Sequence, residues 1–176
     1  MIRLLLVFAL AGLTAGCFQP LYGDQTVTGG SGVRDKMSAV EVAPVVATAG
    51  TRLPRVGGEV RTELMYQLTG GGEANTTSYK LFINIGSTNL QLVSDPNTGR
   101  SEVQNYGIDA SYRLVEVGTG KQVVSGTTFS RVSYDTAGQQ QRFAGVRGLR
   151  DAENRAAKVI AENIRSRLAS YFTAGT

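Results

Sequence analysis

The stretch Tyr79-Lys80-Leu81-Phe82-Ile83-Asn84-Ile85 decides the fold, because apolar residues occupy every second position along it. This period of two is typical of a β-strand that buries one face. The predicted strand covers residues 78–93, and the turn sequence Asp-Pro-Asn-Thr-Gly at residues 95–99 follows it. A chain that turns back at this point is expected to pair its next strand with the first.

The next two predicted strands continue the pattern. One covers residues 102–117 and the other residues 121–134, with Gly118-Thr119-Gly120 as a tight hairpin between them. The apolar side chains on one face of the first of these strands are Tyr106, Ile108, Ala110, Tyr112 and Leu114. Three strands joined by short turns predict an antiparallel meander with one buried face.

A predicted helix at residues 149–171 covers that face, because its apolar side chains recur every three or four residues. The members of the stripe are Leu149, Ala152, Ala156, Val159, Ile160, Ile164, Leu168 and Tyr171. The side chains expected on the opposite, solvated face are Arg150, Glu153, Asn154, Lys158, Glu162 and Arg165. Asp151 lies one turn before Arg155, and this pair is expected to support the start of the helix.

A second amphipathic helix is predicted at residues 55–68. Its buried stripe is Val56, Val60, Leu64, Met65 and Leu68, while Glu59, Arg61 and Glu63 point away and Gly70-Gly71-Gly72 ends it. Before this helix, Val40 and Val42 alternate with polar residues and predict a first strand within residues 37–46. Pro44 cannot donate a ladder hydrogen bond, so it indicates an edge or a strand end.

The predicted order is therefore β-α-β-β-β-α. The fold class is α+β, with two helices packed on one face of a four-stranded sheet, over residues 37–172. Residues 24–36 are polar and rich in Gly, Thr and Ser, so residues 17–36 are expected to form a flexible tether. Residues 173–176 are expected to be a disordered tail.

The first 16 residues have the layout of a secretory signal peptide. Arg3 is followed by an apolar run from Leu4 to Leu13, and small residues then lead to Cys17, the only cysteine. The run is too short for a spanning helix, which needs roughly 20 residues. Leu13-Thr14-Ala15-Gly16-Cys17 indicates a lipoprotein processing site, although Thr14 stands where Leu is commonest. The alternative is an ordinary signal peptide followed by a chance free thiol.

Composition narrows the function classes. The chain of 176 residues has no histidine, which removes the usual general base, the usual catalytic triads and most zinc sites. The glycines form no phosphate-binding loop, and the net charge of +4 is too small to indicate nucleic-acid binding. We therefore expect no enzymatic activity, no cofactor, no metal and no nucleic-acid partner.

Two motifs carry a resemblance to a known family. Directly after Cys17 comes Phe18-Gln19-Pro20-Leu21-Tyr22-Gly23, and the last helix contains Arg150-Asp151-Ala152-Glu153-Asn154-Arg155-Ala156-Ala157 and, further on, Ile164 to Phe172. The chain resembles the alphaproteobacterial branch of the lipopolysaccharide-assembly lipoproteins, the LptE family, over essentially all of the mature sequence. The order of elements predicted from periodicity agrees with that family's fold.

The resemblance implies a non-enzymatic role. Family members sit at the outer membrane, facing the periplasm, and Phe18 after Cys17 is consistent with sorting to that membrane. They plug the β-barrel translocon LptD, assist its folding and bind lipopolysaccharide. In the family, basic residues after the second strand and before the last helix contact this lipid. The corresponding candidates are Arg100 and Arg142, with Arg131 and Lys121 as neighbours. Guanidinium groups suit phosphates because they form paired, charge-assisted hydrogen bonds.

Two other functions stay open at this stage. One is a lipoprotein that scaffolds another envelope assembly for secretion or efflux, and the other is an enzyme that acts on cell-wall material. Co-purification with a large barrel would favour the translocon role over the scaffold. A concave pocket lined by two close carboxylates would favour the enzyme.

Cys17 is expected to be the lipid-bearing N-terminus of the mature protein. Mass spectrometry of protein from native membranes should find an acylated Cys17 and no residues 1–16. Several acyl chains, at about 0.8 kcal/mol per buried methylene, make such an anchor stable. Cys17→Ser should release the protein to the periplasm or leave it unprocessed. A mature chain with a free thiol, or one that begins elsewhere, would contradict the lipoprotein reading.

Overall fold

The computed structural model describes residues 32–72, 74, 76–94, 101–135 and 142–174. The predicted signal peptide, Cys17, most of the predicted tether and the turn with Arg100 lie outside these residues. The elements in chain order are α2 (Val33–Ser38), β1 (Val40–Val42), α3 (Leu53–Thr69), β2 (Tyr79–Ser94), β3 (Ser101–Glu116), β4 (Gln122–Asp135) and α4 (Arg142–Thr173).

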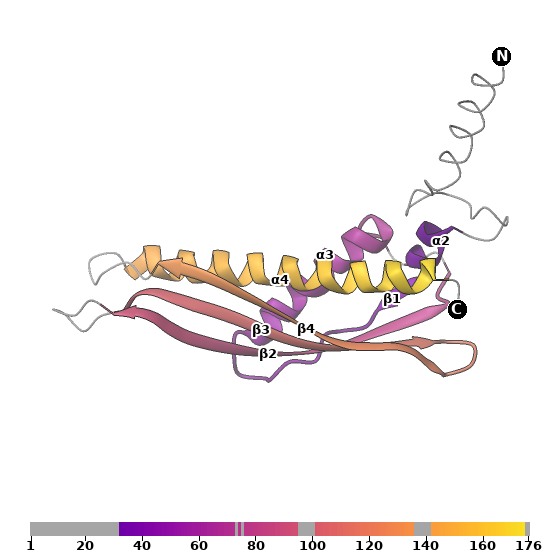
Figure 1. Cartoon of the computed structure of the whole chain (residues 1–176), viewed down its shortest axis with the longest axis horizontal. Coiled ribbons are helices and arrows are strands. Elements are labelled where there is room, and N and C mark those ends of the chain that lie inside the picture. Colours follow the sequence, from indigo (N-terminus) through magenta and orange to yellow (C-terminus); the bar gives the residue numbers. More distant parts are fainter. Residues whose placement is uncertain (1–31, 73, 75, 95–100, 136–141, 175–176) are drawn as a thin grey trace, which may run out of the picture.

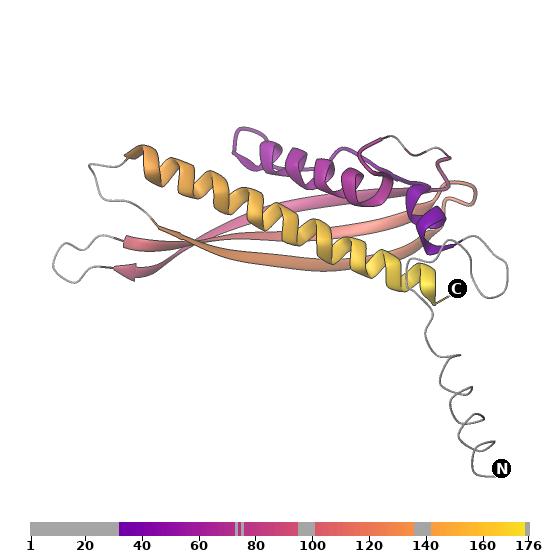
Figure 2. The same ribbon diagram turned by 90° about the horizontal axis from the view of Figure 1, so that it is seen from above.

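The fold is an α+β sandwich of helices on one sheet (Figure 1). The four strands lie in the order β1-β2-β3-β4, where β1 pairs with β2 in parallel and the other pairs are antiparallel. Seen from above, α3 and α4 lie side by side over the same face (Figure 2). The predicted fold class and the antiparallel meander are confirmed.

The register of the meander gathers the predicted apolar residues on the helix-facing side. Leu81 lies opposite Leu114, and Ile83 opposite Tyr112. All these side chains are buried, as are Ile108 and Ala110 further along β3. The predicted hairpin is also present: Gly120 has φ +66°, a left-handed conformation that favours glycine, and its N–H donates to the Glu116 carbonyl at 2.8 Å.

Helix α4 is longer than its sequence predicts, because it begins at Arg142 rather than Leu149. The predicted pair of Asp151 and Arg155 exists, at 2.7 Å, but it lies well inside the helix and does not mark its start. Most of the predicted stripe is buried, and Ile160, Ile164 and Leu168 are fully so. The helix also runs to Thr173, one residue into the predicted tail.

Three positions on α4 differ from the sequence prediction. Val159 is 38% exposed, whereas Glu153 is only 2% exposed, and Arg165 is half-buried. The reason is that α4 packs against two partners. One row of side chains faces the sheet, and a second row, with Glu153, Ala157 and Ala161, is also buried because α3 lies alongside. A prediction that considered the sheet alone turns this second row toward solvent.

The buried Glu153 carboxylate has a cationic partner on α3. The Arg55 guanidinium forms an ion pair with it through Nη2 and donates through Nη1 to Asn154 Oδ1 at 3.1 Å. Tyr106 of β3 is 3% exposed near this pair. Burial, reinforced by the negative charge of Glu153, raises the pKa of Tyr106 to about 12.

Helix α3 begins two residues before the predicted start and ends as predicted. Pro54 occupies the first turn, where its missing N–H costs nothing. Gly70 ends the helix with φ +76°, and its N–H donates to the Tyr66 carbonyl at 3.0 Å. Within the described residues, no helix combines the length and the apolar character needed to cross a bilayer.

The N-terminal part of the fold departs from prediction. Strand β1 has three residues, not ten. After it the chain contacts β2 at Ala43, whose N–H donates to the Leu81 carbonyl at 3.0 Å, and at Val46, which bridges to Asn84. Met37, predicted in this strand, belongs to α2, where Val33 and Met37 are buried. The folded unit therefore starts at about Val33, inside the segment predicted as tether, because a short polar stretch can still bury two apolar side chains one turn apart. The edge position of the predicted first strand is confirmed.

Truncation of a side chain on the buried face of α4 should destabilise the protein far more than truncation of the adjacent, exposed side chain. Ile160→Ala should lower the free energy of unfolding by about 2–5 kcal/mol, because a fully buried side chain leaves a cavity. Val159→Ala, at the exposed position, is the matched control and should cost less than about 1 kcal/mol. Urea denaturation of both variants measures the difference. Equal losses would contradict the observed helix orientation.

Tyr106 should make the protein sensitive to alkali. Folding raises the pKa of Tyr106, so the contribution of this side chain to the free energy of unfolding is intact below pH 10. It is lost as the pH rises toward the pKa in the folded state, about 12. Between pH 8 and pH 11 the wild type should lose about 1.4 kcal/mol more unfolding free energy than Tyr106→Phe. Denaturation curves at both pH values test this. The same pH dependence in both proteins would show that the hydroxyl is not buried.

Candidate functional site

One end of the molecule exposes large apolar and basic side chains. At this end β2 ends, β3 begins, β4 ends and α4 begins (Figure 1). We call it the tip and define it by residues 142–150 of α4 together with Asp135. Helix α4 lies close to the sheet at Gly148, where an added Cβ would lie 3.2 Å from the Asp135 carbonyl oxygen. The residues before Gly148 therefore extend beyond this contact.

The tip exposes apolar side chains that α4 elsewhere buries. Phe143 is 86% exposed and Val146 is 57% exposed. They are three residues apart, so they lie on one side of the helix. Two large apolar side chains on one exposed helical turn mark a surface that suits an apolar ligand.

The tip is also positively charged. Between Asp135 and Asp151 the sequence holds Arg142, Arg147 and Arg150 and no acidic residue. The first turn of α4 has no acidic side chain to compensate the partial positive charge of the helix N-terminus. Arg147 and Arg150 are exposed. Cations beside exposed apolar groups give this end the chemistry of a site for anionic amphiphiles.

The four basic residues singled out from the sequence do not form one cluster. Arg142 is the first residue of α4, at the tip, and Arg100 lies outside the described residues. Lys121 is exposed directly before β4, at the opposite end of that strand from the tip. Arg131 lies on the open face of the sheet, away from the helices. The structure thus retains only Arg142 of the described candidates at the tip.

Arg131 is held by several contacts on the sheet. Its Nη2 pairs with Asp109 Oδ1 at 2.7 Å, and its Nη1 donates to the Ile108 carbonyl at 3.1 Å. The side chain crosses Gly107, where an added Cβ would lie 2.7 Å from Arg131 Cδ. These contacts explain the glycine in the middle of β3. They give Arg131 a structural role and compensate its charge.

The open face of the sheet carries a second set of exposed groups. The Arg113 guanidinium lies 4.6 Å from the centre of the Phe82 ring, and Phe129 is 67% exposed. A shallow hollow of about 590 Å³ opens beside Phe82 and Arg113 and reaches Val46. This face is suited to contact with another surface, but two of its cations are paired with carboxylates, Lys80 with Glu41 and Arg131 with Asp109.

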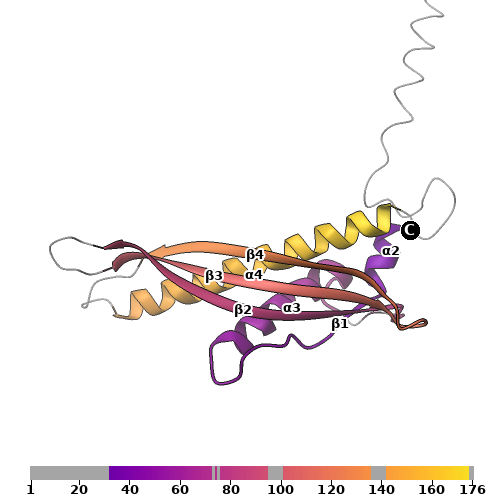
Figure 3. The ribbon, with the colours of Figure 1, turned by 60° about the horizontal axis from the view of Figure 1, so that its bottom comes forward.

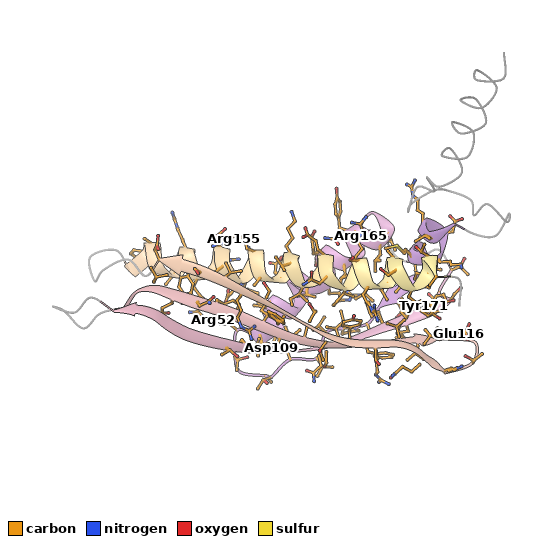
Figure 4. The ribbon with its side chains drawn as sticks, in the orientation of Figure 1. Arg52, Asp109, Glu116, Arg155, Arg165 and Tyr171 are labelled. Carbon is orange, nitrogen blue, oxygen red and sulfur yellow. The ribbon has the colours of Figure 1, made fainter. Side chains whose placement is uncertain are left out.

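The opposite end of the molecule differs in character. A cavity of about 510 Å³ lies among α2, α3 and α4 and is lined by Arg34, Tyr66 and Arg165 among others. Figure 4 shows Arg165 and Tyr171 toward this end of α4, whereas Arg155 lies toward the tip. Among the described residues there is no group of three or more His, Cys, Asp or Glu side chains that could hold a metal ion.

Phe143, Val146 and Arg147 were missed from the sequence. The prediction started the last helix at Leu149, so these residues counted as part of a connection. A signal was present, because Phe143, Val146 and Leu149 follow one another at intervals of three. The two glycines in the same stretch, Gly145 and Gly148, argue against a helix and masked that spacing.

The comparisons with known proteins agree with this fold. A family model described as "LptE: Lipopolysaccharide-assembly" matches residues 37–168. Two solved structures are similar. One, described as a lipoprotein from Caulobacter crescentus CB15, has 23% identity and a TM-score of 0.63 and covers 82% of this chain and 97% of its own. The other, the rare lipoprotein B from Shewanella oneidensis, has 14% identity and a TM-score of 0.53. This match covers 74% of this chain and 96% of the Shewanella chain. No curated protein sequence matches the chain.

The matched region spans nearly the whole folded unit, so the fold defines the class as an envelope lipoprotein of the α+β type. The chain belongs to the LptE family of lipopolysaccharide-assembly lipoproteins. The predicted family is thereby confirmed, on a match that includes most of the last helix and begins after Phe18–Gly23.

Proposed function

We propose that this protein is anchored to the outer membrane through Cys17, plugs the lipopolysaccharide translocon barrel LptD, assists its assembly and binds lipopolysaccharide with the tip. Its role is non-enzymatic. Membership of the LptE family supports the assembly role. The observation that carries the lipid-binding part is the exposed, positively charged and apolar start of α4.

The tip fits both parts of lipopolysaccharide. This lipid carries phosphate groups next to acyl chains, and the tip places Arg147 and Arg150 beside Phe143 and Val146. Arginine binds phosphate through paired, charge-assisted hydrogen bonds. The exposed apolar pair supplies a surface for the first methylene groups of the chains. Neither part alone would distinguish this lipid from a simple anion or a simple hydrocarbon.

The position of the tip supports the same model. Helix α2, the first described element after Cys17, lies beside the C-terminal end of α4, at the end of the molecule away from the tip (Figure 1). A lipid anchor attached before α2 ties this end of the molecule, and not the tip, to the membrane. The tip is then the end that reaches away from the anchor, where a transported lipid would meet it.

Barrel binding separates this function from a scaffold in a secretion or efflux assembly. The full-length protein should be purified from outer membranes in mild detergent, and its partners identified by mass spectrometry. The proposal expects LptD at roughly equal amounts. Recovery of ring or efflux components without LptD would instead support the scaffold.

Reversal of charge at the tip should weaken lipopolysaccharide binding. Arg147→Asp with Arg150→Asp should raise the dissociation constant of purified lipopolysaccharide by about thirtyfold, since two exposed attractions of roughly 0.5 kcal/mol each become repulsions of similar size, a change of about 2 kcal/mol. The effect should shrink at high salt, because exposed charges are screened beyond about 8–10 Å near physiological ionic strength. The double change of Arg100 and Arg142 to Asp should act in the same direction.

The matched control reverses two exposed cations further along the same helix. Lys158→Asp with Arg167→Asp changes the net charge by the same amount away from the tip, and both residues are exposed. This control should bind lipopolysaccharide as the wild type does, and circular dichroism should show all variants folded. Equal weakening by control and tip variants would mean that net charge, and not the tip, governs binding.

A further inference from the structure

One edge of the sheet is covered along only part of its length. Strand β1 pairs with Tyr79–Leu81, and Val46 bridges to Asn84, but β2 continues to Ser94. Figure 3 shows β1 beside one end of β2, with the remainder of β2 at the margin of the sheet. Across the described ranges, no strand pairs with the outer side of β2 beyond Ile85.

The hydrogen bonds at Val46 show which backbone groups face this edge. The Val46 N–H donates to the Ile83 carbonyl at 2.9 Å, and the Ile85 N–H donates to the Val46 carbonyl at 3.0 Å. Backbone groups along a strand point alternately to its two sides. Ser87, Asn89 and Gln91 are therefore the next residues that present N–H and C=O groups outward. The register of β2 shifts after Gln91, which ends this regular row.

The two edges of the sheet are protected differently. On the β4 edge, Arg155 of α4 donates to the Ser133 carbonyl at 3.3 Å, and β4 itself carries Arg131 and Asp135. The β2 segment Gly86-Ser87-Thr88-Asn89-Leu90-Gln91-Leu92-Val93-Ser94 has no charge and no proline. Charges, proline and covering elements are how sheets prevent an added strand. The β4 edge therefore has charges and a covering side chain. The β2 edge has neither charges nor proline along this segment.

We propose that the β2 edge at Ser87–Gln91 binds an extended strand of the barrel partner, which adds to the sheet in line with Val46. This inference rests on the proposed function for the identity of the partner. Main-chain hydrogen bonds would supply the affinity, as in other cases of strand addition. The added strand would come from a loop or terminal segment of the partner, because the strands of a closed barrel already pair on both sides.

A second copy of this chain fits the edge less well than a partner's strand. A two-fold pairing of two β2 edges centred on Asn89 would bring Ser94 of one chain level with Asn84 of the other. Val46 already occupies that position beside Asn84. A single strand from another protein can end before it reaches Val46, so it avoids the overlap.

Hydrogen exchange of the full-length protein, free and co-purified with LptD, tests the proposal. In the complex the Ser87 and Asn89 amides should exchange at least about tenfold more slowly than in the free protein. The reason is that a hydrogen-bonded amide exchanges only when the bond opens. The Thr88 amide points toward β3 and is the internal control, with little change expected. A complex in which Ser87 and Asn89 exchange as in the free protein would overturn the strand addition and leave the plug role standing. Absence of any complex would overturn both.

Proline substitution gives a second test. Asn89→Pro removes one outward N–H and leaves the groups that face β3, so the complex should weaken by about tenfold while circular dichroism stays unchanged. Thr127→Pro makes the matched change on the β4 edge and should bind normally. Equal weakening by both variants would overturn the proposal. The proposal would also be overturned if the Ser87 amide became more protected as the concentration of the protein alone, without the barrel, was raised. That outcome would identify a second copy of the chain as the occupant of the edge.

Discussion

The fold depends on the close approach of α4 to the sheet. Small side chains make that approach possible on both surfaces: Ala152 and Ala156 on the helix are fully buried, and the sheet contributes Gly126 and Ser130 of β4. A methyl group added at Gly126 would come 2.6 Å from the Tyr112 hydroxyl. A large side chain from β3 thus fills the space that the small residues of β4 leave. Interiors this closely packed respond to a single added or removed methylene.

The same approach leaves a polar group inside the helix layer. Because α4 also contacts α3, Glu153 is removed from water, and an unpaired buried carboxylate would be strongly destabilising. Arg55 compensates it from the facing helix, and Asn154 shares the same guanidinium. Buried ion pairs contribute little net stability, but loss of one partner costs several kcal/mol. This pair therefore fixes how α3 and α4 align more than it strengthens their contact.

Much of the fold was predictable from the sequence, since the alternation in β2 and β3 and the stripe on α4 follow directly from the requirement to bury one face. The errors share one physical origin: a periodicity analysis sees one buried face for each element. It cannot show that α3 lies beside α4, which buries Glu153, or that Val33 and Met37 find cover beyond a polar stretch. At the tip, the sequence identified Arg142 through a resemblance but missed Phe143. The interval of three from Phe143 to Val146 and Leu149 pointed to a helix, but Gly145 and Gly148 within the same stretch argued against one.

The length of α4 has a consequence for the proposed lipid anchor. The helix has 32 residues, which at 1.5 Å per residue corresponds to about 48 Å. A bilayer with its headgroups is about 40–45 Å thick. Under the proposed anchoring at Cys17, a rigid rod of this length whose C-terminal end lies at one leaflet would place its far end near the depth of the other. The helix would then act as a ruler, and shortening it by two turns would withdraw the tip by about 11 Å without altering a single residue there.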